Sequence, residues 1–181
     1  GVLHRDLKPA NILLGESKDE HPRIADFGLA KDWTLKRNLT QTGDILGTPY
    51  YMSPEQFRGK GVDHSSDIWA MGVMLYECIT GDRPFEGQDH IEVGNQVRDS
   101  IFAPPRKKIA SIPVDLEAIC FCALANDPAN RYMSADAFAE DLEAYLRGDT
   151  PSHASGVASP GRSTGGPLKA MVLAALATAT L

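Results

Sequence analysis

The sequence has few cysteines, and their number argues against a disulfide scaffold. Three of its 181 residues are cysteine, namely Cys78, Cys120 and Cys122. An odd number in a chain of this length excludes the fully paired framework of a small secreted domain and favours a reducing compartment. Cys120 and Cys122 are two positions apart on a predicted helix, so they share no helix face and lack the usual spacing of zinc ligands. We therefore expect them to pack as small apolar side chains.

An excess of positive charge is also lacking. The formal net charge is −6 at pH 7. Proteins that bind nucleic acid usually carry a basic patch, so we expect no nucleic-acid partner. Hydrophobic residues make up 43% of the chain, which is enough to form a core. For a chain of this length we expect one domain with a tail.

No apolar run reaches the roughly 20 residues that a membrane-spanning helix needs. Residues 147–169 are rich in glycine, serine, proline and threonine, and we expect them to form a flexible linker. The run from Ala170 to Leu181 contains only apolar residues and two threonines. We expect residues 170–181 to begin a transmembrane helix, with Arg162 and Lys169 on its cytoplasmic side. The alternatives are a truncated soluble helix and a coding artefact.

A cluster of polar residues stands near the start of the chain, in the segment His4–Asn11. The Asp6 carboxylate can accept a hydroxyl proton, the Lys8 ammonium can neutralise a phosphate oxygen, and the Asn11 amide oxygen can ligate Mg²⁺. Phosphoryl transfer needs these groups, because it depends mainly on alignment and on charge neutralisation. The His-Arg-Asp tripeptide alone is also common in solvated loops.

Two further motifs follow in order. Residues 24–28 read Ile-Ala-Asp-Phe-Gly, and residues 47–55 read Gly-Thr-Pro-Tyr-Tyr-Met-Ser-Pro-Glu. With the first cluster, this set resembles the protein kinase superfamily over residues 1 to about 146. Within it, the chain is similar to bacterial eukaryotic-like Ser/Thr kinases.

The resemblance implies a protein-kinase-like fold. Residues 1–146 would form its mostly α-helical larger (C-terminal) lobe, with a small β-hairpin at the catalytic loop. Kinases also need a Gly-rich loop, a strand lysine and a helix glutamate, and none of these is present in the sequence. Because the chain begins with Gly1, inside a motif, we expect the smaller N-terminal lobe to be encoded upstream and to be absent here.

The resemblance also assigns roles at the site. Asp6 would orient or deprotonate the acceptor hydroxyl, and Lys8 would neutralise the transferring phosphoryl group. Asn11 and Asp26 would bind Mg²⁺ and, through it, ATP. The presence of Lys8 and Thr48 favours Ser/Thr over Tyr acceptors.

The polar stretch between Asp26 and Glu55 predicts a mobile loop. In kinases of this type a phosphorylated loop residue pairs with the catalytic-loop arginine, here Arg5. Thr40 and Thr42 are the candidate phosphorylation sites, and ordinary loop hydroxyls are the alternative. A dimer in which the protein phosphorylates its own loop is also considered.

Residues 67–79 carry only two charges, which predicts a helix buried on nearly every face. Ser65 or Ser66 could cap its start, and Gly81 could end it. The resemblance implies that Asp67 hydrogen-bonds the catalytic-loop backbone.

Local patterns predict the remaining elements. Residues 11–14 and 23–25 should pair as a hairpin. Helical patterns surround residues 91–97, 116–124 and 135–146. A late motif contains Arg131, and the resemblance implies that it forms a buried ion pair with Glu55.

Two classes of function remain open from the sequence. The first is a Ser/Thr protein kinase that uses ATP and Mg²⁺ on protein substrates, with a cytoplasmic lobe tethered to the membrane by a C-terminal helix. The second is a pseudokinase or interaction module without catalysis. Intact Asp6, Asn11 and Asp26 count against the second class.

Overall fold

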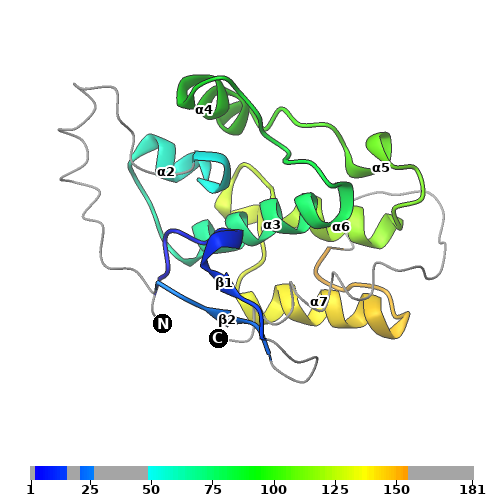
Figure 1. Ribbon diagram of the computed structural model, residues 1–181. Helices are drawn as coiled ribbons and strands as arrows, with labels where there is room; N and C mark the ends of the chain where they lie inside the picture. Colours follow the sequence, from blue (N-terminus) through cyan, green and yellow to red (C-terminus); the bar gives the residue numbers. More distant parts are fainter. Residues whose placement is uncertain (1–2, 16–20, 27–48, 155–181) are drawn as a thin grey trace.

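The computed structural model describes residues 3–15, 21–26 and 49–154. In Figure 1 the long helix α3 runs through the centre of the molecule, with α2 and α4 above it and α7 below it. The elements in chain order are η1 (Pro9–Asn11), β1 (Ile12–Leu13), β2 (Arg23–Ile24), η2 (Pro49–Tyr51), α2 (Pro54–Arg58), α3 (His64–Thr80), α4 (His90–Asp99), α5 (Pro105–Lys108), α6 (Val114–Ala123), η3 (Pro128–Asn130) and α7 (Ala135–Arg147). The described part is thus mostly helical, as predicted.

Helix α3 is buried along most of its length, which confirms the prediction from its apolar sequence. Gly81 ends it in the left-handed conformation, with φ of 81°. The predicted cap was wrong. Asp63 is the N-cap and accepts a hydrogen bond from the Ser65 backbone N–H at 2.8 Å, so the helix starts before both serines. A carboxylate two residues before Ser65 offers the same cap as a serine hydroxyl, and local sequence does not decide between them.

The core forms where α3 meets its neighbours. Trp69 stacks on Phe85 with ring centroids 5.6 Å apart, and both side chains are fully buried. One turn further along, α3 approaches α6 closely at Gly72. A Cβ atom placed there would lie 2.8 Å from the Cβ of Ala123, so glycine is required for this helix contact.

The predicted hairpin is present. Strands β1 and β2 pair antiparallel, with Ile12 opposite Ile24 and Leu13 opposite Arg23. The bond from the Ala25 backbone N–H to the Asn11 carbonyl extends the pairing at 2.8 Å. The hairpin therefore brings the segment after β2 next to η1.

The three helices predicted for the second half are also present, as α4, α6 and α7. Cys120 and Cys122 lie buried on α6, as expected, and burial raises the pKa of both thiols. Among the residues that the structure describes, no group of three or more His, Cys, Asp or Glu side chains could hold a metal ion.

Residues 149–154 lie in the segment predicted as a linker, and part of it packs on the helices. The Asp141 carboxylate, 1% exposed, accepts backbone hydrogen bonds from Ser152 at 2.8 Å, His153 at 3.2 Å and Ala154 at 2.9 Å. Ala154 is itself buried. We call residues 152–154 the C-terminal strap. Residues 155–181 lie outside the described residues. Within the described ranges, no helix is long and apolar enough to cross a bilayer.

Candidate active site

The loop that carries Asp6 is held by the first turn of α3. The Asp67 carboxylate accepts hydrogen bonds from the backbone N–H groups of His4 at 2.9 Å and Arg5 at 2.8 Å. Burial raises the pKa of Asp67, and these two N–H groups oppose that rise by favouring the charged form. The contact expected for Asp67 is therefore present.

Arg5 adopts a left-handed backbone conformation with φ of 65°, which is rare for a residue with a side chain. On the other side of the loop, Gln56 of α2 donates from its Nε2 to the Arg5 carbonyl at 3.0 Å. Strained backbone of this kind persists only where the surroundings enforce it, and it is concentrated at functional sites. Here Asp67 and Gln56 enforce it from opposite sides.

His4 connects the loop to the hairpin. The residue is only 3% exposed. Its ring nitrogen Nε2 lies 2.9 Å from the Ala25 carbonyl oxygen. A carbonyl only accepts, so Nε2 carries the proton and donates. The other ring nitrogen, Nδ1, accepts from the Asp6 backbone N–H at 3.3 Å. The role of His4 was missed from the sequence, because its partners come from two different segments.

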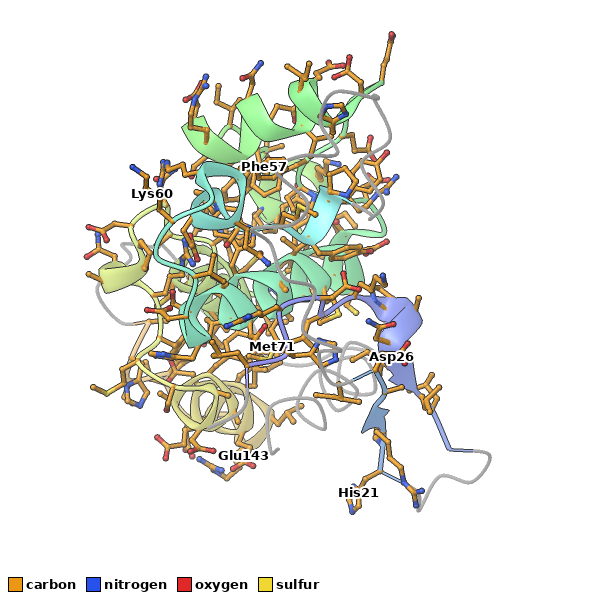
Figure 2. All side chains as sticks on the ribbon, turned by 90° about the vertical axis from the view of Figure 1, so that its left-hand side faces the viewer. His21, Asp26, Phe57, Lys60, Met71 and Glu143 are labelled. Carbon is orange, nitrogen blue, oxygen red and sulfur yellow. The ribbon has the colours of Figure 1, made fainter. Side chains whose placement is uncertain are left out.

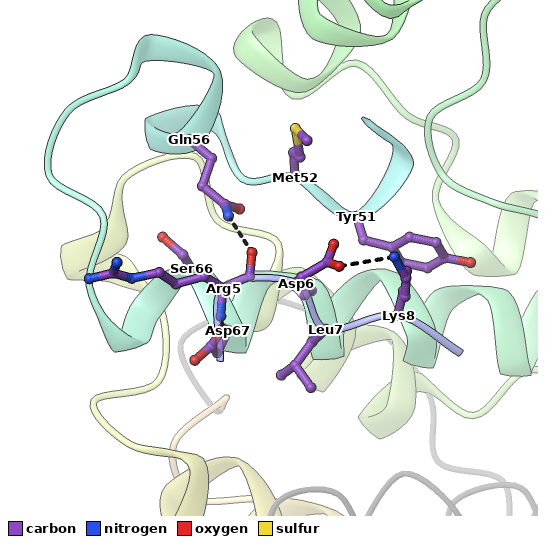
Figure 3. A pocket seen from close by; sticks show the side chains of 10 residues that line it. Arg5, Asp6, Leu7, Lys8, Tyr51, Met52, Gln56, Ser66 and Asp67 are labelled. Carbon is purple, nitrogen blue, oxygen red and sulfur yellow. Dashed lines mark hydrogen bonds and ion pairs between the residues drawn. The ribbon is translucent and has the colours of Figure 1, made fainter. Parts of the chain in front are cut away.

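Asp6 and Lys8 form an ion pair, with Lys8 Nζ 3.0 Å from Asp6 Oδ2 (Figure 3). Both side chains are partly exposed, at 20% for Lys8 and 35% for Asp6. A carboxylate and an ammonium therefore stand together at a surface that a substrate can reach. The residues that line the pocket at this place are Arg5, Asp6, Leu7, Lys8, Tyr51, Met52, Gln56, Ser66, Asp67 and Ala70.

Asn11 and Asp26 come from the two sides of the hairpin base. Asn11, 5% exposed, donates from Nδ2 to the Asp6 carbonyl at 2.8 Å, which orients its side chain through the nitrogen and leaves the amide oxygen for a cation. Asp26 is exposed and has a left-handed φ of 56°. Figure 2 shows Asp26 beside η1, whereas His21 lies at the far end of the hairpin. An amide oxygen and a carboxylate are hard ligands, so this pair fits Mg²⁺.

The buried ion pair expected between Glu55 and Arg131 is present. Arg131 Nη1 lies 2.7 Å from Glu55 Oε1, and Nη2 lies 2.9 Å from Oε2. Ser66 donates to the same carboxylate at 2.6 Å. Burial by itself would raise the pKa of Glu55, but the hydrogen bonds from Arg131 and Ser66 outweigh it and lower the pKa to about 2. This pair ties α2 to the segment before α7.

The structure adds a further contact at the pocket that the sequence analysis did not find. The Tyr51 hydroxyl donates to Glu77 Oε2 at 2.7 Å. Burial, and then the Glu77 carboxylate, raise the pKa of the Tyr51 hydroxyl well above its ordinary value of 10.0. No sequence signal pointed to this pair, since Glu77 sits near the end of an otherwise buried helix.

Thr40, Thr42 and Thr48 lie outside the described residues. Asp6, Lys8, Asn11 and Asp26, in contrast, are brought together around one loop and the hairpin base.

Comparisons with known proteins identify the family of the chain. A family model described as "Protein kinase domain" matches residues 1–142. "Serine/threonine-protein kinase PknB" of Mycobacterium leprae is 41% identical over 152 residues, which are 83% of this chain and 24% of that protein. The "Probable serine/threonine-protein kinase PknB" of Bifidobacterium longum is 36% identical over 83% of the chain and 22% of its own length.

A relative with another printed specificity also matches. "Tyrosine-protein kinase MasK" of Myxococcus xanthus is 42% identical over 145 residues, which are 80% of the chain and 22% of that protein. The chain thus spans about a quarter of the length of the curated relatives it matches.

Proposed function

Because this chain belongs to the protein kinase domain family, we propose that the protein transfers the γ-phosphoryl group of ATP to Ser and Thr hydroxyl groups of protein substrates. The observation that carries the proposal is the Asp6–Lys8 pair, 3.0 Å apart, on a loop whose backbone is held by Asp67. A rigidly held base beside a cation is what an in-line displacement on phosphorus requires.

Each group of the site has a part in the transfer. Asp6 orients the acceptor hydroxyl and takes its proton as the new oxygen–phosphorus bond forms. The bond between the γ-phosphorus and the bridging oxygen breaks, and ADP leaves with that oxygen. Lys8 neutralises negative charge on the transferring group. Asp6 can act in this way because Asn11 and His4 hold the backbone on either side of it.

Asn11 and Asp26 would hold the metal ion. When bound, Mg²⁺ neutralises charge on the ATP phosphates. The support for this assignment is the Asn11 side chain, which is fixed through its nitrogen while its oxygen is left for a ligand. Asp26 supplies a carboxylate from the neighbouring segment.

The choice of Ser and Thr over Tyr rests on Lys8, and on Thr48 through the resemblance. The relatives carry both specificities in their printed names. A direct test is to offer the full-length protein one peptide in three versions with Ser, Thr or Tyr as the acceptor. We expect transfer to Ser and Thr, and transfer to Tyr alone would overturn this part of the proposal.

The role of Asp6 is tested in the full-length protein with Asp6→Asn. This change should lower the turnover number by about 10²- to 10⁴-fold, because proton transfer is lost. Affinity for ATP, measured by calorimetry, should remain nearly the same, since Asp6 faces the acceptor. Asp26→Ala should instead weaken Mg²⁺-dependent ATP binding. No transfer by the unmodified protein would favour the pseudokinase alternative, and equal losses of binding and turnover in Asp6→Asn would contradict the assignment.

The 181-residue polypeptide expressed by itself should show no measurable ATP-dependent phosphorylation of a protein substrate. Its sequence contains no Gly-rich loop to bind the α- and β-phosphates, so most of the binding energy for ATP would be missing. Asp6-dependent transfer by this polypeptide would refute that expectation.

We also propose that the apolar run from Ala170 to Leu181 begins a membrane anchor, and that dimers phosphorylate Thr40 and Thr42. The run has 12 residues where a span needs about 20, so sequence that continues it should add about eight further apolar residues. A charged continuation would remove the anchor. Phosphopeptide mapping of the full-length protein with and without Asp6→Asn tests the two threonines.

A further inference from the structure

We propose that Arg83, which lies over the Tyr50 ring, binds an acidic side chain of the peptide substrate. This inference rests on the proposed function, because it names the substrate class for the same site. The starting observation is the guanidinium carbon of Arg83, 3.8 Å from the centroid of the Tyr50 ring. Arg83 keeps part of its surface open, with 32% of the side chain exposed.

Stacking fixes the plane of the guanidinium and leaves its edge available. A guanidinium that lies on a ring contacts it through its face, whereas its N–H groups point outward in the plane. Those N–H groups match the two oxygens of a carboxylate. The Tyr50 ring therefore holds Arg83 in the orientation that a bidentate contact with an acidic side chain needs.

Among the described residues, Arg83 has only a weak ionic partner. Its Nε lies 3.9 Å from Glu86 Oε1, and the Glu86 side chain is 61% exposed. An exposed pair at this distance contributes little, so an incoming carboxylate can replace it. The Glu77 carboxylate accepts the Tyr51 hydroxyl at 2.7 Å, and within the described residues it forms no ion pair with Arg83. The weak contact with Glu86 therefore leaves the N–H edge of Arg83 open to an incoming carboxylate.

The loop that carries Arg83 is held at several points. Phe85, two residues later, is fully buried and stacks on Trp69. Glu86 exchanges two hydrogen bonds with Gln96 of α4, one at 2.6 Å from Gln96 Nε2 to the Glu86 carbonyl and one at 3.3 Å from the Glu86 N–H to Gln96 Oε1. On the other side, Asp82 pairs with Lys108 at 3.0 Å. A contact made from such a loop loses little conformational freedom on binding.

The position of Tyr50 places Arg83 within reach of a bound peptide. Tyr50 is followed directly by Tyr51, which lines the pocket with Asp6 and Lys8. Consecutive Cα atoms are about 3.8 Å apart, and an extended peptide advances about 3.3 Å per residue. When the acceptor hydroxyl of a bound peptide lies at Asp6, peptide residues a few positions away therefore lie over the Tyr50–Arg83 pair.

The test uses the full-length protein and a set of Ser-centred peptides. Each peptide carries glutamate at one position within five residues of the serine, and its partner carries glutamine there. Fluorescence anisotropy gives the affinity of each pair for the unmodified protein, for Arg83→Gln and for Lys107→Gln. The last variant is the control, since it removes one exposed positive charge on α5. A third variant, Glu86→Gln, removes the competing carboxylate.

We expect glutamate to bind about five- to tenfold more tightly than glutamine at one or two positions. Arg83→Gln should abolish this preference, Lys107→Gln should keep it, and Glu86→Gln should increase it. No preference in the unmodified protein, or the same preference in Arg83→Gln, would overturn the proposal. Binding needs no transfer, so this result stands even if the protein phosphorylates nothing. Transfer to Ser or Thr with an unchanged preference in Arg83→Gln would remove only this inference.

Discussion

Glu55 and Arg131 are 76 positions apart in the sequence, yet their side chains form a two-pronged ion pair at 2.7 and 2.9 Å in the interior. The Arg131 guanidinium also donates to the Ser65 carbonyl at 2.9 Å and lies 4.9 Å from the Trp69 ring. One side chain thus connects α2, the start of α3 and the segment that leads to α7. The wall of the pocket that contains Gln56 depends on this connection, because Gln56 is also part of α2.

Removal of one partner of this pair should be costly. Glu55→Gln or Arg131→Met should lower the free energy of unfolding by about 3 to 5 kcal/mol, because each leaves a buried charge without its counter-ion. The double variant Glu55→Met/Arg131→Met should lose less than the sum of the single losses. Urea unfolding of the full-length protein, followed by tryptophan fluorescence, measures all of these. Additive losses would show that the two side chains act independently.

The same pair predicts a dependence of stability on pH. The pKa of Glu55 falls from 4.5 to about 2 on folding. A lowered folded-state pKa gives stability that is fully present above pH 4.5 and is lost as the pH falls from there towards 2, by about 3 kcal/mol in total. Chemical denaturation between pH 2 and 6 should show this slope. In Glu55→Gln this component should be absent, and an unchanged slope would contradict the assignment.

Asp67 should affect turnover more than stability. Asp67→Ala leaves the backbone N–H groups of His4 and Arg5 without their acceptor, so Asp6 loses its position and turnover should fall by about 10²-fold. Asp67→Asn keeps one acceptor oxygen, so its turnover should lie between that of the unmodified protein and that of Asp67→Ala. The control is Asp63→Ala, which removes the cap of the same helix and should cost about 1 kcal/mol with little change in turnover. Steady-state kinetics at saturating ATP distinguishes them, and equal turnover in the two alanine variants would be the contrary result.

The C-terminal strap should depend on Asp141. Its carboxylate accepts three backbone N–H groups of residues 152–154 and the Tyr132 hydroxyl at 3.0 Å. Asp141→Ala leaves these donors without an acceptor, so the backbone amides of the strap should exchange with deuterium faster. The free energy of unfolding should fall by about 1 to 3 kcal/mol.

Glu140→Gln is the matched control for the strap. Its side chain is exposed, and among the described residues the polar partner of its carboxylate is the His153 ring, at 3.2 Å. Hydrogen exchange in this variant should match that of the unmodified protein. If Asp141→Ala also left the exchange of residues 152–154 unchanged, the strap would be held by its apolar contacts, such as that of Ala154, rather than by the carboxylate.

The chemical groups of the site could be predicted from the sequence, because each motif is a local run of residues with its own chemistry. The same holds for α3, whose apolar residues predict burial, and for its end at Gly81. The hairpin followed from two short apolar runs around a polar turn. The ion pair of Glu55 with Arg131 was inferred from the family resemblance, and nothing in the local sequence of either residue indicates it.

What the sequence alone determined is therefore which chemical groups are present and which helices and strands carry them. Only the tertiary structure decided how the loop around Asp6 is held. The left-handed conformation of Arg5 is unfavourable locally, and it exists because the distant residues Asp67 and Gln56 offset its cost. The placement of Arg83 over Tyr50 likewise required the folded loop after α3 to meet η2. Contacts between segments far apart in the chain decide such positions, and no local pattern encodes them.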